Sequence, residues 1–213
     1  LGFQAGDSES YISWKSFFKS LKQRGLRGVD LVTSDDHSGL VKAINELFPG
    51  VTWQRCQTHF SRNLLDKVPG KAKKEVHGRL KDLYNSPDLK EAYSRRDALL
   101  NYLEQTAPHA VGTLDEGFAD ITAIFSLPEK YRKRLRTSNS IERLNEEIRR
   151  RERVIRIFPN EESIERLLGS LLIEHHENWI SGKTYLNMED YYQEKEQVRE
   201  EEKILRQELE RTA

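Results

Sequence analysis

Two short β-branched runs, each followed by a helical pattern, constrain the fold of this chain more than any other feature. The runs are VDLVTS at residues 29–34 and VTWQRC at residues 51–56. Between them, residues 37–50 repeat apolar side chains at helical spacing and end at a Pro-Gly pair. Parallel strands need a crossover connection, which is usually a helix. The alternation therefore predicts an α/β fold in which a parallel sheet carries helices on its faces.

The segment before these runs is also expected to be regular. Residues 1–5 are interpreted as the end of a strand, and aromatic residues recur at helical spacing between residues 8 and 25. Gly25 is a suitable residue for ending that helix. The chain opens on an apolar run without Met, as if a strand had been entered midway, so we expect a fragment of a longer protein.

A long stretch without strand signals follows. Residues 70–127 have helical periodicity, and Pro87, Pro108 and Pro128 divide them into separate helices. We therefore expect four segments along the chain. They are the first part of the α/β core at 1–65, an all-helical insertion at 66–130, C-terminal core helices at 131–180, and a polar helix or disordered tail at 181–213.

The charge of the chain is heavy but balanced, with 35 basic and 35 acidic residues, so the net charge identifies no partner. A single cysteine excludes a disulfide framework and fits a reducing compartment. No apolar run is long enough to cross a bilayer, and the first residues do not have the pattern of a signal peptide. These features favour a globular intracellular protein.

Asp35 and Asp36 directly follow the first β-branched run, and two interpretations compete for them. A side-chain oxygen of one of them would cap the helix that begins near Ser38, which is worth about 1 kcal/mol. Ligands of open α/β sheets bind beyond the carboxyl ends of strands, so a carboxylate at this place would also hold a metal ion. Because there are two carboxylates, both interpretations can hold.

Glu142 is a further acidic residue of interest. Asn139 and Glu142 have the spacing of a capping box, with Glu142 at the third helical position. Helical geometry then predicts a buried stripe of apolar residues with Glu142 along its border. The residues of that stripe are Ile141, Leu144 and Ile148. A carboxylate beside a packed face is held more firmly than one in open solvent, which suits a metal ligand.

Cys56 and His59 form a Cys-x-x-His pair. A structural zinc site needs four ligands, usually from two such pairs, and the chain has no second cysteine. A packed cysteine and a histidine at the start of a helix, next to the edge of the sheet, is therefore the favoured interpretation, and a zinc-binding helical protein is the weaker one.

Basic residues concentrate between Lys130 and Arg156, where eleven Lys or Arg accompany four Glu. Arginine predominates in the second half of this segment, and its planar fork suits phosphate. The alternatives are a solvated helix face and a nucleic-acid footprint. The arginines concerned are Arg143, Arg149, Arg150, Arg151 and Arg153.

Three motifs taken together resemble one family. SDDHSGL, WQRCQTHFSRNL and TSNSIERLNEEIRRRERVIRIFP occur in the order found in bacterial insertion-sequence transposases of the Mutator type, and the opening of the chain is similar to theirs as well. The resemblance extends to about Trp179. It implies a ribonuclease H-like core with a DDE triad and an all-helical insertion between the second Asp and the Glu. The strandless stretch lies where that insertion belongs.

The resemblance also implies roles for individual residues. The second catalytic Asp falls on Asp35 and the Glu on Glu142, whereas Asp36 occupies a variable position and is the better candidate for the helix cap. Cys56 and His59 match the family's Cys-x-x-His signature, whose role is left open. The first catalytic Asp should lie before residue 1, so we expect this chain alone to be unable to complete the active site.

The resemblance implies metal-dependent cleavage and joining of DNA strands. Mg²⁺ (or Mn²⁺) would be held by Asp35 and Glu142, since this ion prefers hard oxygen ligands. Arg143 and the cluster from Arg149 to Arg153 would bind the DNA backbone. The implied partners are transposon-end and target DNA, with a homo-oligomer assembled on the DNA and no membrane partner. The implied location is the bacterial cytoplasm, at the nucleoid.

A rival interpretation comes from another functional class. A truncated remnant of such an enzyme could keep the helical insertion and the basic helix, and bind DNA or sister subunits without cutting. A strand bearing an Asp in the upstream sequence would favour the enzyme over the remnant.

Overall fold

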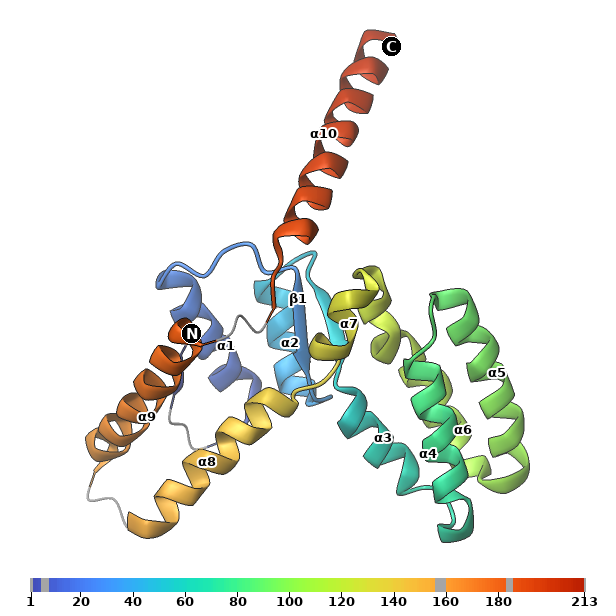
Figure 1. The fold of residues 1–213 in the computed structure, drawn as a ribbon, viewed down its shortest axis with the longest axis horizontal. Helices are drawn as coiled ribbons and strands as arrows, with labels where there is room; N and C mark the ends of the chain where they lie inside the picture. Colours follow the sequence, from blue (N-terminus) through green and yellow to red (C-terminus); the bar gives the residue numbers. More distant parts are fainter. Residues whose placement is uncertain (1, 5–7, 156–159, 183–185, 213) are drawn as a thin grey trace. The chain divides into compact units, whose positions relative to one another are not determined.

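The computed structural model describes residues 2–4, 8–155, 160–182 and 186–212 (Figure 1). The chain divides into two compact units, Leu1–Glu161 and Glu162–Ala213, which are treated separately below. Most of the described residues are helical. None of the described helices has the length and apolar character needed to cross a membrane.

The first unit contains a small parallel sheet. Strand β1 (Leu31–Ser34) pairs with strand β2 (Thr52–Arg55), with Leu31 opposite Thr52 and Ser34 opposite Arg55. Helix α2 (Ser38–Leu47) provides the crossover between them. This confirms the predicted strand–helix–strand alternation and the parallel pairing. The sheet has two strands in the described part of the chain, so a ribonuclease H-like core stays a prediction.

Helix α1 (Tyr11–Gln23) packs against the crossover helix α2. Its N-cap is Ser10, whose side chain accepts a hydrogen bond from the backbone N–H of Ser13. Gly25 follows the helix with φ of +102°, the left-handed conformation that glycine adopts most easily. The predicted strand end at residues 1–5 is wrong for residues 2–4, which form no regular structure, and residues 1 and 5 lie outside the described residues.

The helical stretch at residues 70–127 folds together with the helix before it into one cluster. It comprises α3 (Gln57–Leu65), α4 (Gly70–Tyr84), α5 (Leu89–Thr106), α6 (Pro108–Thr122) and the short 3₁₀ helix η1 (Ala123–Ser126). The predicted breaks are confirmed: α4 ends before the turn at Pro87, α6 begins at Pro108, and Pro128 precedes the next helix. Pro108 can occupy the first helical position because the N–H that it lacks would be unpaired there.

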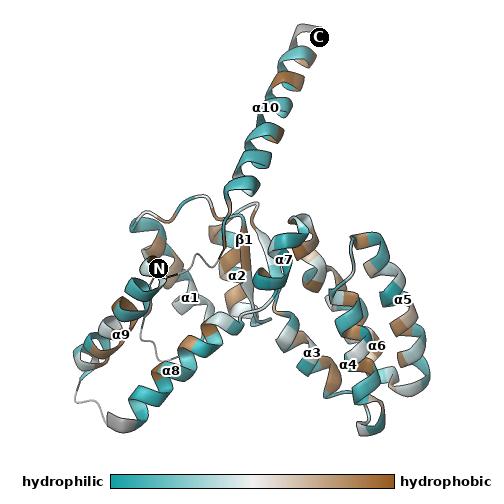
Figure 2. Ribbon diagram, viewed as in Figure 1, coloured by the Kyte–Doolittle hydropathy of each residue, from teal (hydrophilic) through white to brown (hydrophobic). Residues whose placement is uncertain are grey.

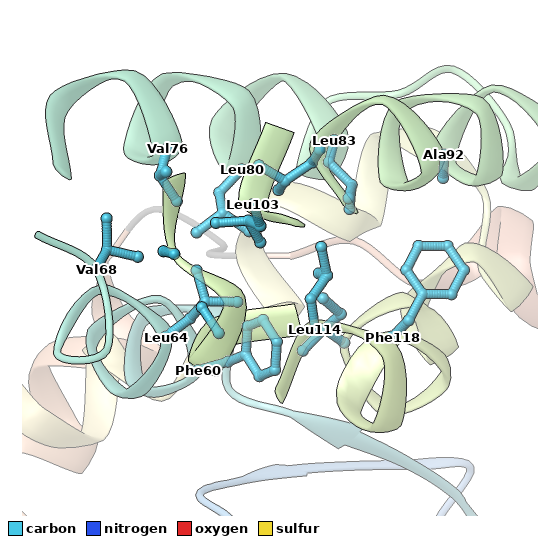
Figure 3. Packing of buried hydrophobic residues seen from close by; sticks show 14 residues of the cluster. Phe60, Leu64, Val68, Val76, Leu80, Leu83, Ala92, Leu103, Leu114 and Phe118 are labelled. Carbon is cyan, nitrogen blue, oxygen red and sulfur yellow. The ribbon is translucent and has the colours of Figure 1, made fainter. Parts of the chain in front are cut away.

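The main hydrophobic core lies among these helices rather than on the sheet. Its side chains converge between α3, α4, α5 and α6 (Figure 3). Burial of their apolar surface stabilises the fold by roughly 25 cal/mol for each Å² removed from water. The core residues include Phe60, Leu64, Val76, Leu80, Leu83, Leu99, Leu103, Leu114, Phe118 and Ile121.

Two buried glutamines join this cluster to the sheet. Gln54 of β2 donates from Nε2 to the carbonyl of Ile121 (3.1 Å) and accepts from the N–H of Ile124 at Oε1 (2.7 Å). Gln57 of α3 donates to the same Ile121 carbonyl at 2.9 Å. The end of α6 and the start of η1 are thereby fixed against β2.

The chain then returns to the sheet through α7 (Glu129–Leu135) and enters α8 (Asn139–Ile155). The Thr33 hydroxyl of β1 donates to the carbonyl of Leu135 at 2.6 Å. Arg132 and Arg136 bind backbone carbonyls at the ends of the helical cluster, including those of Leu127, Pro87 and Tyr84. Arg132 and Arg136, two residues of the basic segment, therefore hold the fold together through these hydrogen bonds.

The second unit consists of two helices, α9 (Glu161–Ser181) and α10 (Glu189–Thr212). Of the two alternatives expected for the segment from residue 181, a polar helix or a disordered tail, residues 189–212 form the helix. Hydrophilic residues cover most of α10 (Figure 2), which fits the excess of Glu in its sequence.

Candidate active site

The carboxyl ends of the two strands meet at one edge of the sheet, and the candidate residues gather there. Asp35 and Asp36 follow β1, and Cys56 follows β2. The strands are parallel with Ser34 opposite Arg55, and the N–H of Cys56 donates to the carbonyl of Ser34 at 2.6 Å. The register thus places Asp35 and Cys56 side by side in the backbone, each one residue beyond its strand.

Asp35 and Asp36 have different surroundings. Asp36 forms an ion pair with Arg55, at 2.9 Å between Oδ2 and Nη1. Asp35 is exposed and has no ionic partner among the residues that the structure describes. Of the two carboxylates, Asp35 is therefore the one that is available to a ligand.

The prediction that Asp36 caps α2 is wrong. The N-cap is His37, whose Nδ1 accepts from the N–H of Leu40 at 3.4 Å. Asp36 instead pairs with Arg55, which is largely buried above the ring of Phe60 and needs a counter-ion there.

Arg55 also affects a carboxyl group on α6. The partial burial of Asp120 raises the pKa of that group, and the positive charge of Arg55 opposes the shift.

Glu142 reaches the same edge of the sheet from the first turn of α8. The Ser138 hydroxyl lies 2.9 Å from Glu142 Oε1 and 3.2 Å from Cys56 Sγ, and the N–H of Ser138 donates to that sulfur at 3.4 Å. A serine hydroxyl carries one proton. If it donates to the carboxylate, its oxygen accepts from the Cys56 thiol, so that Cys56, Ser138 and Glu142 form one chain of hydrogen bonds.

His59 completes a cluster around Glu142. Its Nε2 lies 3.7 Å from Glu142 Oε1, and its Nδ1 is buried without a hydrogen-bond partner among the described residues. Cys56, His59 and Glu142 each bring one potential ligand atom within 4.8 Å of the others. Asp35 is not a member of this three-residue cluster. Cys56 is fully buried and His59 lies in the first turn of α3.

The expected capping box of Asn139 and Glu142 is wrong, because Asn139 is already helical and Glu142 is the fourth helical residue instead of the third. Asn139 is the first helical residue, and its Oδ1 accepts from the Thr58 hydroxyl at 3.2 Å. The carbonyl of Ser138 accepts from the N–H of Glu142, and the Ser138 hydroxyl binds the Glu142 side chain. Ser138 therefore directly precedes α8, and its carbonyl accepts the first helical hydrogen bonds, from the N–H groups of Ile141 and Glu142.

The predicted buried stripe of α8 is wrong as well. Ile141 is 58% exposed, and Leu144 and Ile148 are only half-buried. Helical spacing places these residues on one face, but nothing in the described part of the chain covers that face fully. Glu142, itself half-buried, is held by Ser138 rather than by a packed stripe.

The arginines of α8 are exposed, but they are not equivalent. Glu147 accepts from Arg150 at 2.7 Å and from Arg151 at 3.0 Å, and these hydrogen bonds lower the pKa of Glu147 to about 2. By contrast, some of the arginines have no ionic partner among the described residues and are fully available to an anion. These are Arg143, Arg149 and Arg153.

The donor types decide which cation would suit this edge. Asp35 and Glu142 each offer carboxylate oxygens, the donor type that a hard divalent ion such as Mg²⁺ prefers, and Glu142 Oε2 is not engaged by any described residue. Cys56 and His59 are softer ligands that suit transition metals. Together with Glu142 they supply three ligands, which falls short of the four of a structural zinc site.

Comparison with known proteins gives the family. A family model described as "Transposase, Mutator family" matches residues 1–182. The chain is 44% identical over 195 residues to the transposase for insertion sequence element ISRM5 of Rhizobium meliloti (strain 1021), covering 92% of the chain and 49% of that relative.

Two further relatives agree. Identity is 41% over 192 residues to the transposase for IS256 in transposon Tn4001 of Staphylococcus aureus, covering 89% of the chain and 49% of the relative. It is 40% over 189 residues to the transposase for IS1081 of Mycobacterium tuberculosis (strain ATCC 25618 / H37Rv), covering 89% and 46%. The chain spans about half the length of these curated relatives, and it belongs to the Mutator family of transposases.

Proposed function

We propose that this chain is the catalytic part of a DDE transposase that cleaves DNA at transposon ends and joins the freed ends to target DNA. One observation carries the proposal. The carboxylate of Glu142 is tied through Ser138 to Cys56, the residue after β2, while Asp35 follows the neighbouring parallel strand β1. This arrangement supports a shared site for two acidic residues that are 107 positions apart in the sequence.

The two carboxylates have a common role in this proposal. Asp35 and Glu142 would hold Mg²⁺ or Mn²⁺, which supplies activation of the attacking oxygen and stabilisation of the leaving oxygen. Asp35 extends from a strand end and Glu142 from the first turn of a helix, so both are attached to rigid elements. The resemblance assigns the remaining Asp of such a triad to no residue of this chain.

The reaction would proceed by two in-line displacements at phosphorus. In the first, a water oxygen bonds to the phosphorus, the bond to the 3′ oxygen breaks, and the 3′ oxygen leaves as a hydroxyl. In the second, that 3′-OH bonds to a phosphorus of target DNA and displaces the target's own 3′ oxygen. Each step breaks one P–O bond and forms one, and no oxidation occurs.

The fold assignment belongs to the same proposal. We infer that β1, α2 and β2 are part of a ribonuclease H-like core, with residues 66–130 as its helical insertion and residues 131–180 as its C-terminal helices. Joining two transposon ends needs one active site at each end, which favours a homo-oligomer on the DNA.

Metal removal tests the proposal directly. We expect the whole transposase to cut a labelled duplex that carries its transposon end, leaving a 3′-OH, in the presence of Mg²⁺ or Mn²⁺. Excess EDTA should stop cleavage completely, and excess Mg²⁺ should restore it. DNA binding without any cleavage under these conditions would instead support a non-catalytic module.

The unpaired arginines of α8 give a separate prediction. Replacing Arg143, Arg149 and Arg153 by Ala should weaken DNA binding and flatten the plot of log K against log salt. The slope should fall by up to about 0.9 for each phosphate that the variant no longer binds. Fluorescence anisotropy at several salt concentrations measures both quantities.

A matched control removes the same charge elsewhere. Arg199, Lys203 and Arg206 lie on α10, outside the residues that the family model matches. Their replacement by Ala should leave the salt slope unchanged. Equal slopes for the α8 variant and the unaltered protein would show that the α8 arginines form only a solvated face.

A further inference from the structure

A groove next to the candidate active site is lined by an excess of positive charge. It has a volume of about 670 Å³ and lies between α3, α4 and the segment that joins α7 to α8. Its lining contains one carboxylate, Asp66, against several cationic side chains. These are Arg62, Lys73, Lys81, Lys133 and Arg136, with His77 between the two lysines of α4. We call this the α3–α4 groove.

The charge of the α3–α4 groove is not neutralised within the protein. Arg62, Lys73, Lys81 and Lys133 are exposed, and none of them has an ionic partner among the described residues. Some arginines elsewhere on the same helical cluster are paired: Arg79 with Glu75 and Arg95 with Glu91, each one helical turn apart. An unpaired cluster on a chain of zero net charge marks a surface that attracts a polyanion.

The cations of α4 are regularly spaced. Lys73, His77 and Lys81 follow each other at intervals of four residues, so they form one line along the helix. Eight residues of helix extend about 12 Å. The phosphates of one DNA strand advance about 3.4 Å along the duplex axis per nucleotide, so this line spans about three to four nucleotides. Arg136 is different, because it binds the Tyr84 carbonyl and is half-buried.

The α3–α4 groove is lined by residues that neighbour the candidate active site in sequence. Its lining includes Thr58 and Asn139, which are hydrogen-bonded to each other at 3.2 Å. Thr58 precedes His59, and Asn139 begins the helix that carries Glu142. A backbone held at Glu142 can therefore continue past Thr58 to Arg62 and on to the cations of α4.

We propose that the α3–α4 groove binds the sugar–phosphate backbone of the DNA that flanks the cleaved phosphodiester. The position of the cleaved bond relative to the groove rests on the proposed function. The binding of DNA by the groove does not depend on it. The groove would position the flank without reading its sequence, because the cationic side chains reach phosphate oxygens and not base edges. It also assigns a binding role to the helical insertion.

A charge-matched pair of variants tests the inference on the 213-residue chain. The groove variant carries Lys73→Ala, Lys81→Ala and Lys133→Ala. The control carries Lys71→Ala, Lys74→Ala and Lys90→Ala, which removes the same charge from exposed lysines outside the groove. We expect the groove variant to bind a 30-base-pair duplex about tenfold more weakly or worse, with a salt slope lower by about 2 to 3. The control should stay within about twofold of the unaltered chain.

Three outcomes would overturn the inference. Unchanged affinity in the groove variant would do so, and so would equal losses in both variants, which would indicate a diffuse charge effect. Displacement of the duplex by poly-glutamate at the same charge concentration would point to an acidic protein partner. Circular dichroism and the thermal midpoint of each variant verify that it is folded. The inference and the proposed function fail separately, since cleavage by the whole transposase is measured independently of this binding.

Discussion

Replacing Glu142 by glutamine is expected to lower the rate of metal-dependent DNA cleavage by the whole transposase about a thousandfold or more, with DNA affinity within about twofold of the unaltered protein. In the proposed function, the substitution removes one negative charge and one oxygen that would bind the metal ion. Loss of several kcal/mol of transition-state stabilisation corresponds to that change in rate. Glutamine keeps the shape and an Oε1 that can accept from Ser138, so the first turn of α8 should persist.

The matched control is Glu146→Gln. Glu146 lies one turn further along α8, is exposed, and has no ionic partner among the described residues, so its replacement removes the same charge from the same helix. Its cleavage rate should be unchanged. Single-turnover cleavage at saturating protein separates the chemical step from binding. Cleavage by the Glu142 variant at the unaltered rate would exclude Glu142 from the catalytic site.

The order of the secondary structure could be predicted because its signals are local. β-Branched runs marked both strands, and Pro108 and Pro128 placed helix boundaries, since proline lacks the N–H that a helix interior requires. Hydrophobic periodicity found the helices of the insertion. The sequence did not predict that the large core lies among α3 to α6 while the sheet in the described residues has two strands.

Interactions between distant residues explain the errors. Asp36 has a suitable residue type and position for a helix cap, but it forms an ion pair with the partly buried Arg55, and His37 is the N-cap. Ile141 has helical spacing with its neighbours, but spacing indicates a shared face and not what covers it. Both outcomes depend on packing that a local pattern does not contain.

The candidate site shows the same division. Asp35 and Glu142 were named from motifs, and the parallel register explains why the residues after β1 and β2 are neighbours. Ser138 was missed, because its importance lies in contacts with a sulfur 82 positions away and a carboxylate four positions away. The α3–α4 groove was missed for a related reason: its cations come from α3, α4 and α7, and no single segment of sequence shows them as a cluster.

The link between the helical insertion and the sheet gives the largest expected effect on stability. Gln54→Leu should lower the free energy of unfolding by about 2–4 kcal/mol, although leucine is similar in size. Gln54 is fully buried, and the N–H of Ile124 has Oε1 of this side chain as its acceptor. Removing that acceptor leaves a buried donor unpaired, which costs about 1–3 kcal/mol in addition to the lost hydrogen bonds. Urea unfolding followed by circular dichroism measures the change.

Gln57→Leu is the matched comparison. Gln57 donates to the Ile121 carbonyl, as Gln54 does, but it does not accept from the N–H of Ile124. The Ile121 carbonyl accepts from both glutamines, so it keeps a partner when either one is replaced. Gln57→Leu should therefore cost about 1 kcal/mol, less than Gln54→Leu. The double variant should lose more free energy of unfolding than the two single variants together, because only the double variant leaves the Ile121 carbonyl unpaired. Equal costs for the two single variants, or strict additivity, would contradict the assignment of the Gln54 side chain as the main connection between β2 and the insertion.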